Sequence, residues 1–189
     1  LDAGLGVCLG WPMSIPPRPA SLRLADPSAP AHERLYRMLR QQIMHGELAP
    51  GLSMTLRGLA AQYDMSMTPA REAVRRLAAE GALLPQGNRR VTVPRVSLAL
   101  LDQIAFARLT IEPHLAELAA AHLTPALIAR LEALDAQVDA AIRAGDITAY
   151  LQSNHAFHFA LYEASNAPVL VDMARSLWLR FGPSLRIVV

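Results

Sequence analysis

Residues 66–77 read SMTPAREAVRRL, and this stretch decides the fold. Either Ser66 or Thr68 is a suitable N-cap, and Pro69 fits the first turn of a helix, where its missing N–H is not needed. We therefore expect a helix from about Pro69 to Glu80 that ends at Gly81. The apolar residues that should face inward from it are Ala73, Val74 and Leu77.

The segments around this helix complete a small domain. Residues 32–46 carry apolar side chains at helical spacing, and residues 56–63 predict a short second helix after a turn at 48–51. Residues 83–85 and 91–93 flank a polar loop and predict a hairpin. This order of elements predicts a winged helix-turn-helix. The apolar positions of the first two helices are Leu35, Met38, Leu39, Ile43, Leu56, Leu59, Ala60 and Tyr63.

The chain after Pro94 is helical almost throughout. Pro113 should kink or split the first helix of this part, and Gly182-Pro183 should end the last one. The fold class we expect is mainly α, an N-terminal winged helix-turn-helix followed by an antiparallel α-helical bundle. The bundle helices are expected near residues 98–122, 125–144, 146–165 and 167–181.

Charge is divided unevenly along a chain that has 18 basic residues, all arginine, and a formal net charge of +2. Residues 1–30 are neutral and hold six of the 14 prolines, which predicts a flexible leader. Residues 31–96 carry a net charge of +5 and residues 97–189 carry −3. This division predicts two domains, the first with a polyanionic partner, although short segments also differ in charge by chance.

The composition excludes several kinds of site. Cys8 is the single cysteine, which excludes an internal disulfide and a zinc site built from cysteines, and which suits a reducing cytoplasm. No stretch approaches the ~18 consecutive apolar residues of a membrane helix. The sequence has no Ser/His/Asp order, no Cys nucleophile near a base and no glycine-rich phosphate loop, so we do not expect an enzyme.

Two groups of motifs resemble a known family. Residues 46–51 read GELAPG and residues 68–77 read TPAREAVRRL, and at this spacing they resemble the DNA-binding domain of GntR-family transcriptional regulators. Residues 108–112 (RLTIE), 154–158 (NHAFH) and 166–168 (NAP) resemble the FCD (FadR C-terminal) effector domain of the same superfamily. The resemblance implies a cytoplasmic regulator, most often a repressor, that binds a double-stranded DNA operator as a homodimer and makes no membrane contact.

The expected recognition helix carries residue types that read DNA. Ser66 and Thr68 can reach phosphates or base edges, and Arg71 can pair with guanine O6 and N7 in the major groove. Arg75 follows one turn later on the same face and suits a phosphate contact. The resemblance implies that Arg57, on the preceding helix, also approaches DNA.

Several positions depart from the family pattern. Met67 stands where relatives commonly have a base-reading arginine, so we expect a different operator or weaker binding. Asp64 replaces a common glycine at the turn, where Asp tolerates left-handed geometry. Gly87 comes early in the wing, and Arg89 and Arg90 follow it, which suits a narrow minor groove or flanking phosphates. The alternative for each arginine is a solvated side chain without a DNA contact.

Arg108 lies one turn before Glu112 in the first helix of the second domain. The resemblance implies that Arg108 faces an effector cavity and holds the carboxylate of a small organic acid, a pairing that the guanidinium geometry suits. The alternative is an intrahelical salt bridge between Arg108 and Glu112 on the surface.

Asn154 and His158 are four residues apart and so share one helix face. The resemblance implies that they are the first two protein ligands of a divalent metal such as Zn, Ni or Mn, with two histidines from later helices. The alternative for His158 is a hydrogen-bonded core histidine, and His155 should lie on the surface. Since the sequence reaches Val189 before those later helices, we expect the bundle to be incomplete, with its final helices missing.

Two other functions stay open. A truncated regulator would bind DNA constitutively or act through mixed dimers with a full-length relative. A metal-dependent hydrolase would be built around Asn154, His155 and His158, but no other feature of the sequence supports it.

Overall fold

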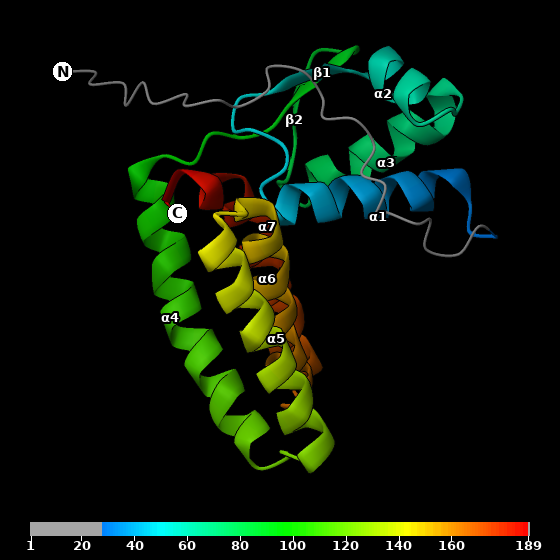
Figure 1. Cartoon of the computed structure of the whole chain (residues 1–189). Coiled ribbons are helices and arrows are strands. Elements are labelled where there is room, and N and C mark those ends of the chain that lie inside the picture. Colours follow the sequence, from blue (N-terminus) through cyan, green and yellow to red (C-terminus); the bar gives the residue numbers. More distant parts are fainter. Residues whose placement is uncertain (1–27, 189) are drawn as a thin grey trace.

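A computed structural model describes the backbone of residues 28–188 and the side chains of residues 28–184 (Figure 1). The leader expected over residues 1–30 lies almost entirely outside the described residues, as does Cys8. The described part is mainly helical, with a winged helix-turn-helix followed by a helical bundle, so the expected fold class is confirmed. The elements are α1 (Ala31–Met44), β1 (Ser53–Thr55), α2 (Leu56–Gln62), α3 (Met67–Ala79), β2 (Leu84–Gln86), β3 (Arg90–Thr92), α4 (Leu98–Ala120), α5 (Pro125–Ala144), α6 (Ile147–Glu163) and α7 (Pro168–Val188).

The strands form one antiparallel sheet in the order β1-β3-β2. Val91 of β3 lies opposite Met54 of β1 and Pro85 of β2, and both Val91 and Met54 are buried. The sequence predicts the β2–β3 hairpin, which is the wing, but it does not predict β1. A strand of three residues with one buried side chain is too short for its alternating pattern to be recognised.

The helix-turn-helix closely follows the sequence expectations. Asp64 adopts the left-handed conformation expected of it between α2 and α3, with φ of 50°. Ser66 is the N-cap of α3, although its side chain makes no capping hydrogen bond, and the helix begins at Met67 rather than Pro69. The buried face of α3 includes Ala73, Val74 and Leu77, as expected. This face packs on α1 and leaves the N-terminal end of α3 exposed.

The sequence predicts that Pro113 kinks or splits the first bundle helix; α4 is continuous through it, so there is no split. A proline here cannot donate to the carbonyl of Leu109, one turn earlier. Leu109 is 75% exposed and Pro113 is exposed as well, so water is able to hydrogen-bond to that carbonyl. The solvated side of a helix tolerates a proline that its buried side would not.

Helix α7 continues through Gly182 and Pro183, where the sequence predicts its end. Packing overrides the local preference, because Gly182 is buried against the last turn of α1. A Cβ on Gly182 would lie 2.5 Å from the carbonyl oxygen of Ile43. Leu179, one turn before, is part of the core of the winged domain. Helix α7 therefore joins the two halves of the chain.

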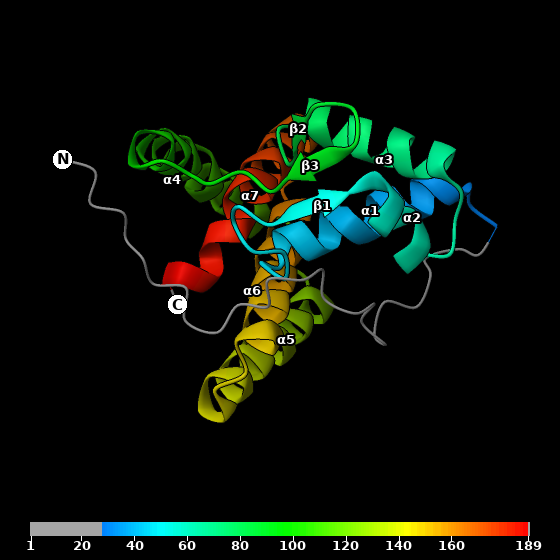
Figure 2. The same ribbon diagram turned by 90° about the horizontal axis from the view of Figure 1, so that it is seen from above.

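The bundle meets the winged domain at the C-terminal end of α1. Figures 1 and 2 show α1 crossing the end of the bundle, with α6 and α7 beneath it. A second core lies inside the bundle and consists of Leu115, Phe159, Tyr162, Val171, Ala174 and Trp178. Within residues 28–188, the helices are too short or too polar to cross a bilayer.

Candidate nucleic-acid interface and effector cavity

Residues of α2, α3 and the wing line one concave surface, which encloses a hollow of about 670 Å³. Two backbone-level contacts build it. The Thr55 hydroxyl accepts a hydrogen bond from the Gly58 N–H (2.9 Å) and so caps α2, and the Leu56 N–H donates to the carbonyl of Arg89 (3.0 Å). These contacts fix the start of α2 beside the wing. The residues that line the surface are Thr55, Leu56, Arg57, Met67, Arg71, Asn88, Arg89 and Arg90.

An adjoining hollow of about 400 Å³ continues this surface along α3. It is lined by Arg71 and Arg75 of the helix and by Gly87 and Arg90 of the wing, among others. Gly87 has φ of 65°, a left-handed conformation that lets the wing turn sharply. The structure thus brings the expected contact residues of the helix and the wing together. Ser66 and Thr68 are also exposed, at the N-terminal end of α3.

The arginines of this surface are free of carboxylate partners. Within the described part of the chain, none of the ion pairs includes one of the five arginines of this surface, which are Arg57, Arg71, Arg75, Arg89 and Arg90. Arg76 provides the contrast on the opposite side of α3. It pairs with Glu33 (2.7 Å) and Glu80 (3.6 Å) and lies 3.6 Å from the ring centroid of Tyr36. The positive charge of the concave surface is therefore available to a polyanion.

A second cavity, of about 490 Å³, lies between α4 and α6 in the bundle. Its polar wall contains Arg108, Glu112, His158 and Tyr162, and its apolar wall includes Phe157. Arg108 donates to both oxygens of Glu112, at 2.6 and 3.2 Å. The intrahelical salt bridge that the sequence left as the alternative for Arg108 is formed, but it lines the cavity instead of the surface, with Arg108 and Glu112 20% and 13% exposed.

Glu112 is the centre of a hydrogen-bond network within the bundle. Besides Arg108, its carboxylate accepts from the Tyr162 hydroxyl (3.0 Å) and from Trp178 Nε1 (2.7 Å). Burial, followed by the Glu112 charge, raises the pKa of Tyr162, so its hydroxyl stays protonated as a donor. Burial also lowers the pKa of His158, with the Glu112 charge opposing and the Arg108 charge reinforcing this shift. His158 is therefore held toward its neutral form.

The described residues do not supply the ligand set of a divalent metal. Asn154 and His158 lie on α6 as expected, but His158 Nδ1 is 3.1 Å from the Tyr162 hydroxyl. The nearby carboxylate of Glu112 already accepts from three side chains. Within residues 28–188, no group of three or more His, Cys, Asp or Glu side chains is arranged to hold a metal. A closed site needs about four to six ligands.

His155 is not the surface residue that the sequence predicts. Its ring stacks on Phe159 with a centroid distance of 4.5 Å and makes edge contacts with Trp178 (5.5 Å) and with His45, the C-cap of α1 (5.4 Å). His155 and Phe159 are four residues apart and so share one face of α6. Because Phe159 is an apolar aromatic residue expected in the core, this spacing could have indicated that His155 also points inward. His45 could not be found in this way, because its neighbours come from another domain.

Comparison with known proteins agrees with this geometry. Residues 31–93 match the family described as "Bacterial regulatory proteins, gntR family", and residues 103–188 match the "FCD domain". The solved structure of E. coli McbR/YncC is 34% identical, with a TM-score of 0.81, over 85% of this chain and 76% of that one. The chain belongs to the GntR family of bacterial transcriptional regulators. It is thus a DNA-binding regulator with an FCD domain and not an enzyme.

Curated relatives of this GntR-family chain are regulators too. The HTH-type transcriptional regulator McbR of Escherichia coli K12 is 37% identical over 147 residues, which are 78% of this chain and 66% of McbR. The HTH-type transcriptional repressor RspR of the same strain is 27% identical over 80% of this chain and 67% of RspR. The chain therefore spans about two thirds of the length of these relatives. A Rhodococcus regulator structure at 22% identity shares the fold, with a TM-score of 0.64.

Proposed function

We propose that this regulator represses transcription by binding an operator half-site with the N-terminal end of α3 and with the wing. The single observation that carries the proposal is the concave surface on which Arg57, Arg71, Arg89 and Arg90 meet without carboxylate partners. Arginine reads guanine in the major groove and enters narrow minor grooves, so one surface offers both contacts. Repression is supported by the description of RspR as a repressor.

Met67 sets the character of the base contact in this proposal. Its side chain is 38% exposed on the concave surface, next to Arg71 in the lining. A thioether offers an apolar contact, which suits the methyl group of thymine rather than a guanine edge. We therefore propose that Arg71 reads a guanine and that Met67 favours a neighbouring thymine. Arg75 and Arg90 hold the flanking phosphates.

The effector in this proposal is a small organic acid bound in the bundle cavity. Its carboxylate would take the place of Glu112 on Arg108, because both oxygens of Glu112 already accept from that guanidinium. Glu112 also holds Trp178 of α7, and α7 packs on α1 of the winged domain. An exchange of partners at Arg108 would therefore reach the DNA-binding half through α7. The coupling is a difference in free energy between two arrangements of the domains.

The proposal includes two domains, residues 31–96 and 97–189, and a homodimer formed through the second. Exposed apolar side chains on α4 support such a contact, with Phe106 and Leu109 at 74% and 75% exposure. Clusters of this kind mark association surfaces.

A resident divalent metal would need ligands in addition to Asn154 and His158. The location is cytoplasmic, because a DNA-binding regulator works where the chromosome lies.

Selection of bound sequences from a random DNA pool tests the proposal. We expect the full chain to enrich a pseudo-palindrome whose half-sites contain a G·C pair, since a symmetric dimer reads two equivalent half-sites. The Arg71→Ala variant should lose the preference at that pair. The Arg143→Ala variant removes the same charge from an arginine of α5 that is 72% exposed, and it should enrich the same sequence as the unmodified chain. Enrichment of no sequence would refute operator binding.

A further inference from the structure

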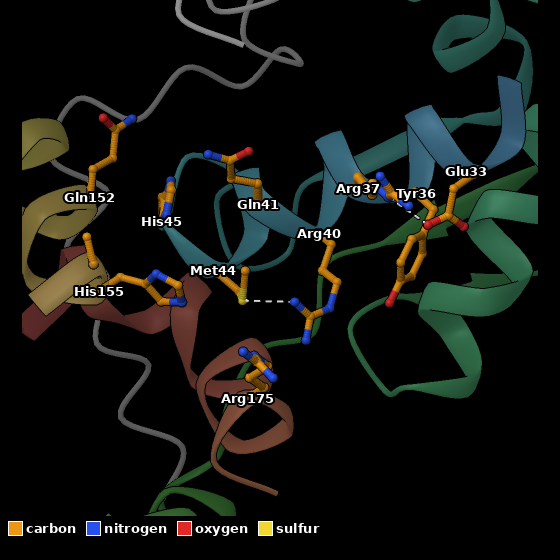
Figure 3. A pocket seen from close by; sticks show the side chains of 11 residues that line it. Glu33, Tyr36, Arg37, Arg40, Gln41, Met44, His45, Gln152, His155 and Arg175 are labelled. Carbon is orange, nitrogen blue, oxygen red and sulfur yellow. Dashed lines mark hydrogen bonds and ion pairs between the residues drawn. The ribbon is translucent and has the colours of Figure 1, made fainter. Parts of the chain in front are cut away.

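A groove of about 550 Å³ lies between the two halves of the chain, at the C-terminal part of α1 (Figure 3). Helix α1 forms one wall with Arg37 and Arg40, Arg175 of α7 lies on the opposite wall, and His45, the C-cap of α1, and His155 of α6 meet in the floor between them. This interdomain groove shares no lining residue with the bundle cavity. Its volume is in the range of small-molecule sites, about 300–1,000 Å³.

Two arginines give the groove its charge. Figure 3 shows Arg40 and Arg175 reaching into the groove from opposite walls. The third arginine, Arg37, is held by Glu33 through a hydrogen bond of 2.7 Å. Arg175 donates to Glu163 (2.7 Å) and Asp172 (3.0 Å), so an anion would share it with these carboxylates. The groove therefore presents one guanidinium from each domain to a common space.

Among the described residues, Arg40 makes one hydrogen bond and one long ion pair, and both are weak interactions for a guanidinium. Its Nη1 donates to the thioether sulfur of Met44 at 3.4 Å, although sulfur is a poor acceptor. Its nearest carboxylate oxygen belongs to Glu80 and lies 3.5 Å from Nε, beyond the usual length of a charge-assisted bond. Arg40 is also only 21% exposed, so little water replaces these partners. An oxyanion in the groove would be a stronger acceptor.

Polar atoms in the floor of the groove lack partners. His45 Nδ1 and His155 Nε2 are buried and make no hydrogen bond within the described part, and His45 is only 6% exposed. The nearest carboxylate to His45 Nδ1 belongs to Glu47, at 3.9 Å. Buried polar atoms without partners are costly and point to a ligand or a water that completes them.

The surroundings of His155 include the positive charges of two arginines. Burial is the largest cause that lowers the pKa of His155, to about 3. After burial, repulsion of the protonated ring by His45, Arg40, His158 and Arg175, in this order, lowers the pKa of His155 further. Both guanidinium groups thus act on the same point in the floor. Because His45 and His155 are neutral near pH 7, the positive charge that a bound anion would balance there belongs to Arg40 and Arg175.

We propose that the interdomain groove binds the oxyanion group of a small metabolite, a carboxylate or a phosphate, between Arg40 of α1 and Arg175 of α7. The oxyanion accepts from both guanidinium groups, and the histidine nitrogens of the floor bind a polar part of the same molecule. Because the two arginines belong to different domains, the ligand fixes the winged domain against the bundle. Binding itself does not depend on the proposed operator recognition; only its effect on DNA affinity does.

Isothermal titration calorimetry with the full chain tests the proposal. Inorganic phosphate and succinate are the two probes, each titrated in chloride buffer at constant ionic strength, and they distinguish a phosphorylated ligand from a carboxylic acid. We expect one of them to bind with one equivalent per chain. Arg40→Gln and Arg175→Gln should each weaken binding by about tenfold or more, because charge-assisted hydrogen bonds of this kind are lost.

Two matched variants locate the site. Arg143→Gln and Arg130→Gln each remove the same charge from an exposed position of α5, and both should leave binding unchanged. Arg175 also pairs with Glu163 and Asp172, so Arg40→Gln decides the result if Arg175→Gln does not fold. Absence of binding by both probes, or equal binding by Arg40→Gln and the unmodified chain, overturns the proposal. Loss of binding in Arg143→Gln overturns it as well.

Discussion

Trp178 Nε1 donates to Glu112 Oε1 at 2.7 Å and so joins α7 to α4 inside the bundle. Trp178 is 1% exposed, and Arg108 lies 4.5 Å from the centroid of its ring while it also binds Glu112. One carboxylate therefore links the arginine of the bundle cavity to the helix that packs on the winged domain.

Trp178→Phe should destabilise the chain because it leaves Glu112 with one donor fewer in a buried setting. We expect the free energy of unfolding in urea to fall by about 1.5–3 kcal/mol from the lost hydrogen bond to a charged group, with a further loss from the smaller ring. In a double-mutant cycle with Glu112→Gln, the two changes should be strongly non-additive. Additive effects would mean that the bond contributes nothing to stability.

The histidine at the end of α1 predicts a pH-dependent stability. Burial lowers the pKa of His45 to about 4 from an ordinary value near 6.5, and His155 of α6 and Glu47 face its ring. Between these two pH values the unfolded chain binds more protons, so the free energy of unfolding should decrease as the pH falls. The slope due to His45 is at most about 1.4 kcal/mol per pH unit.

The His45→Gln variant checks this slope by urea unfolding at several pH values. It should flatten the dependence between pH 6.5 and 4. His114→Gln, at an exposed position of α4, should keep the dependence of the unmodified chain. An unchanged slope in His45→Gln would show that other groups cause the acid sensitivity.

The sign of the stability change in Gly182→Ala tests the close contact between α7 and α1. In an exposed helix, Gly→Ala stabilises by up to about 1 kcal/mol. At position 182 the new Cβ would lie 2.5 Å from the Ile43 carbonyl oxygen and 2.7 Å from Met44 Cα, both backbone atoms. We therefore expect Gly182→Ala to lower the free energy of unfolding by about 1–3 kcal/mol as the two domains are forced apart. A stabilised variant would contradict the close contact between α1 and α7.

Metal content is the fourth measurable expectation. Asn154 and His158 provide two ligands, and the Tyr162 hydroxyl already contacts one nitrogen of His158. We expect the purified chain to hold far less than one equivalent of Zn, Ni or Mn after dialysis against a chelator, as measured by elemental analysis. One tightly held equivalent would show a ligand set that these residues do not form.

Local patterns predicted most of the secondary structure, and contacts between distant segments account for what they missed. Helix α3 and the wing followed from apolar spacing and from turn residues. Strand β1 pairs with β3 across a long stretch of sequence, and α7 continues past Gly182 because α1 lies against it. Neither contact can be recognised from the pattern of residues that are neighbours in the sequence.

The candidate sites divide in the same way. Arg71 and Arg90 could be predicted because the family motif and their own chemistry point to DNA. The interdomain groove could not, since Arg40, His155 and Arg175 come from three helices and carry no shared motif. His155 was misplaced on the surface because its partner His45 belongs to the other domain.

The most direct measurement is fluorescence anisotropy of the selected operator and of unrelated DNA with three variants, at several salt concentrations. Arg71→Ala should weaken operator binding by about 1–3 kcal/mol and lower the ratio between operator and unrelated DNA. Arg90→Ala should weaken both DNAs alike and reduce the salt slope by about one. Arg143→Ala should change neither quantity. If Arg71→Ala keeps the full ratio between operator and unrelated DNA, α3 is not the element that reads the sequence.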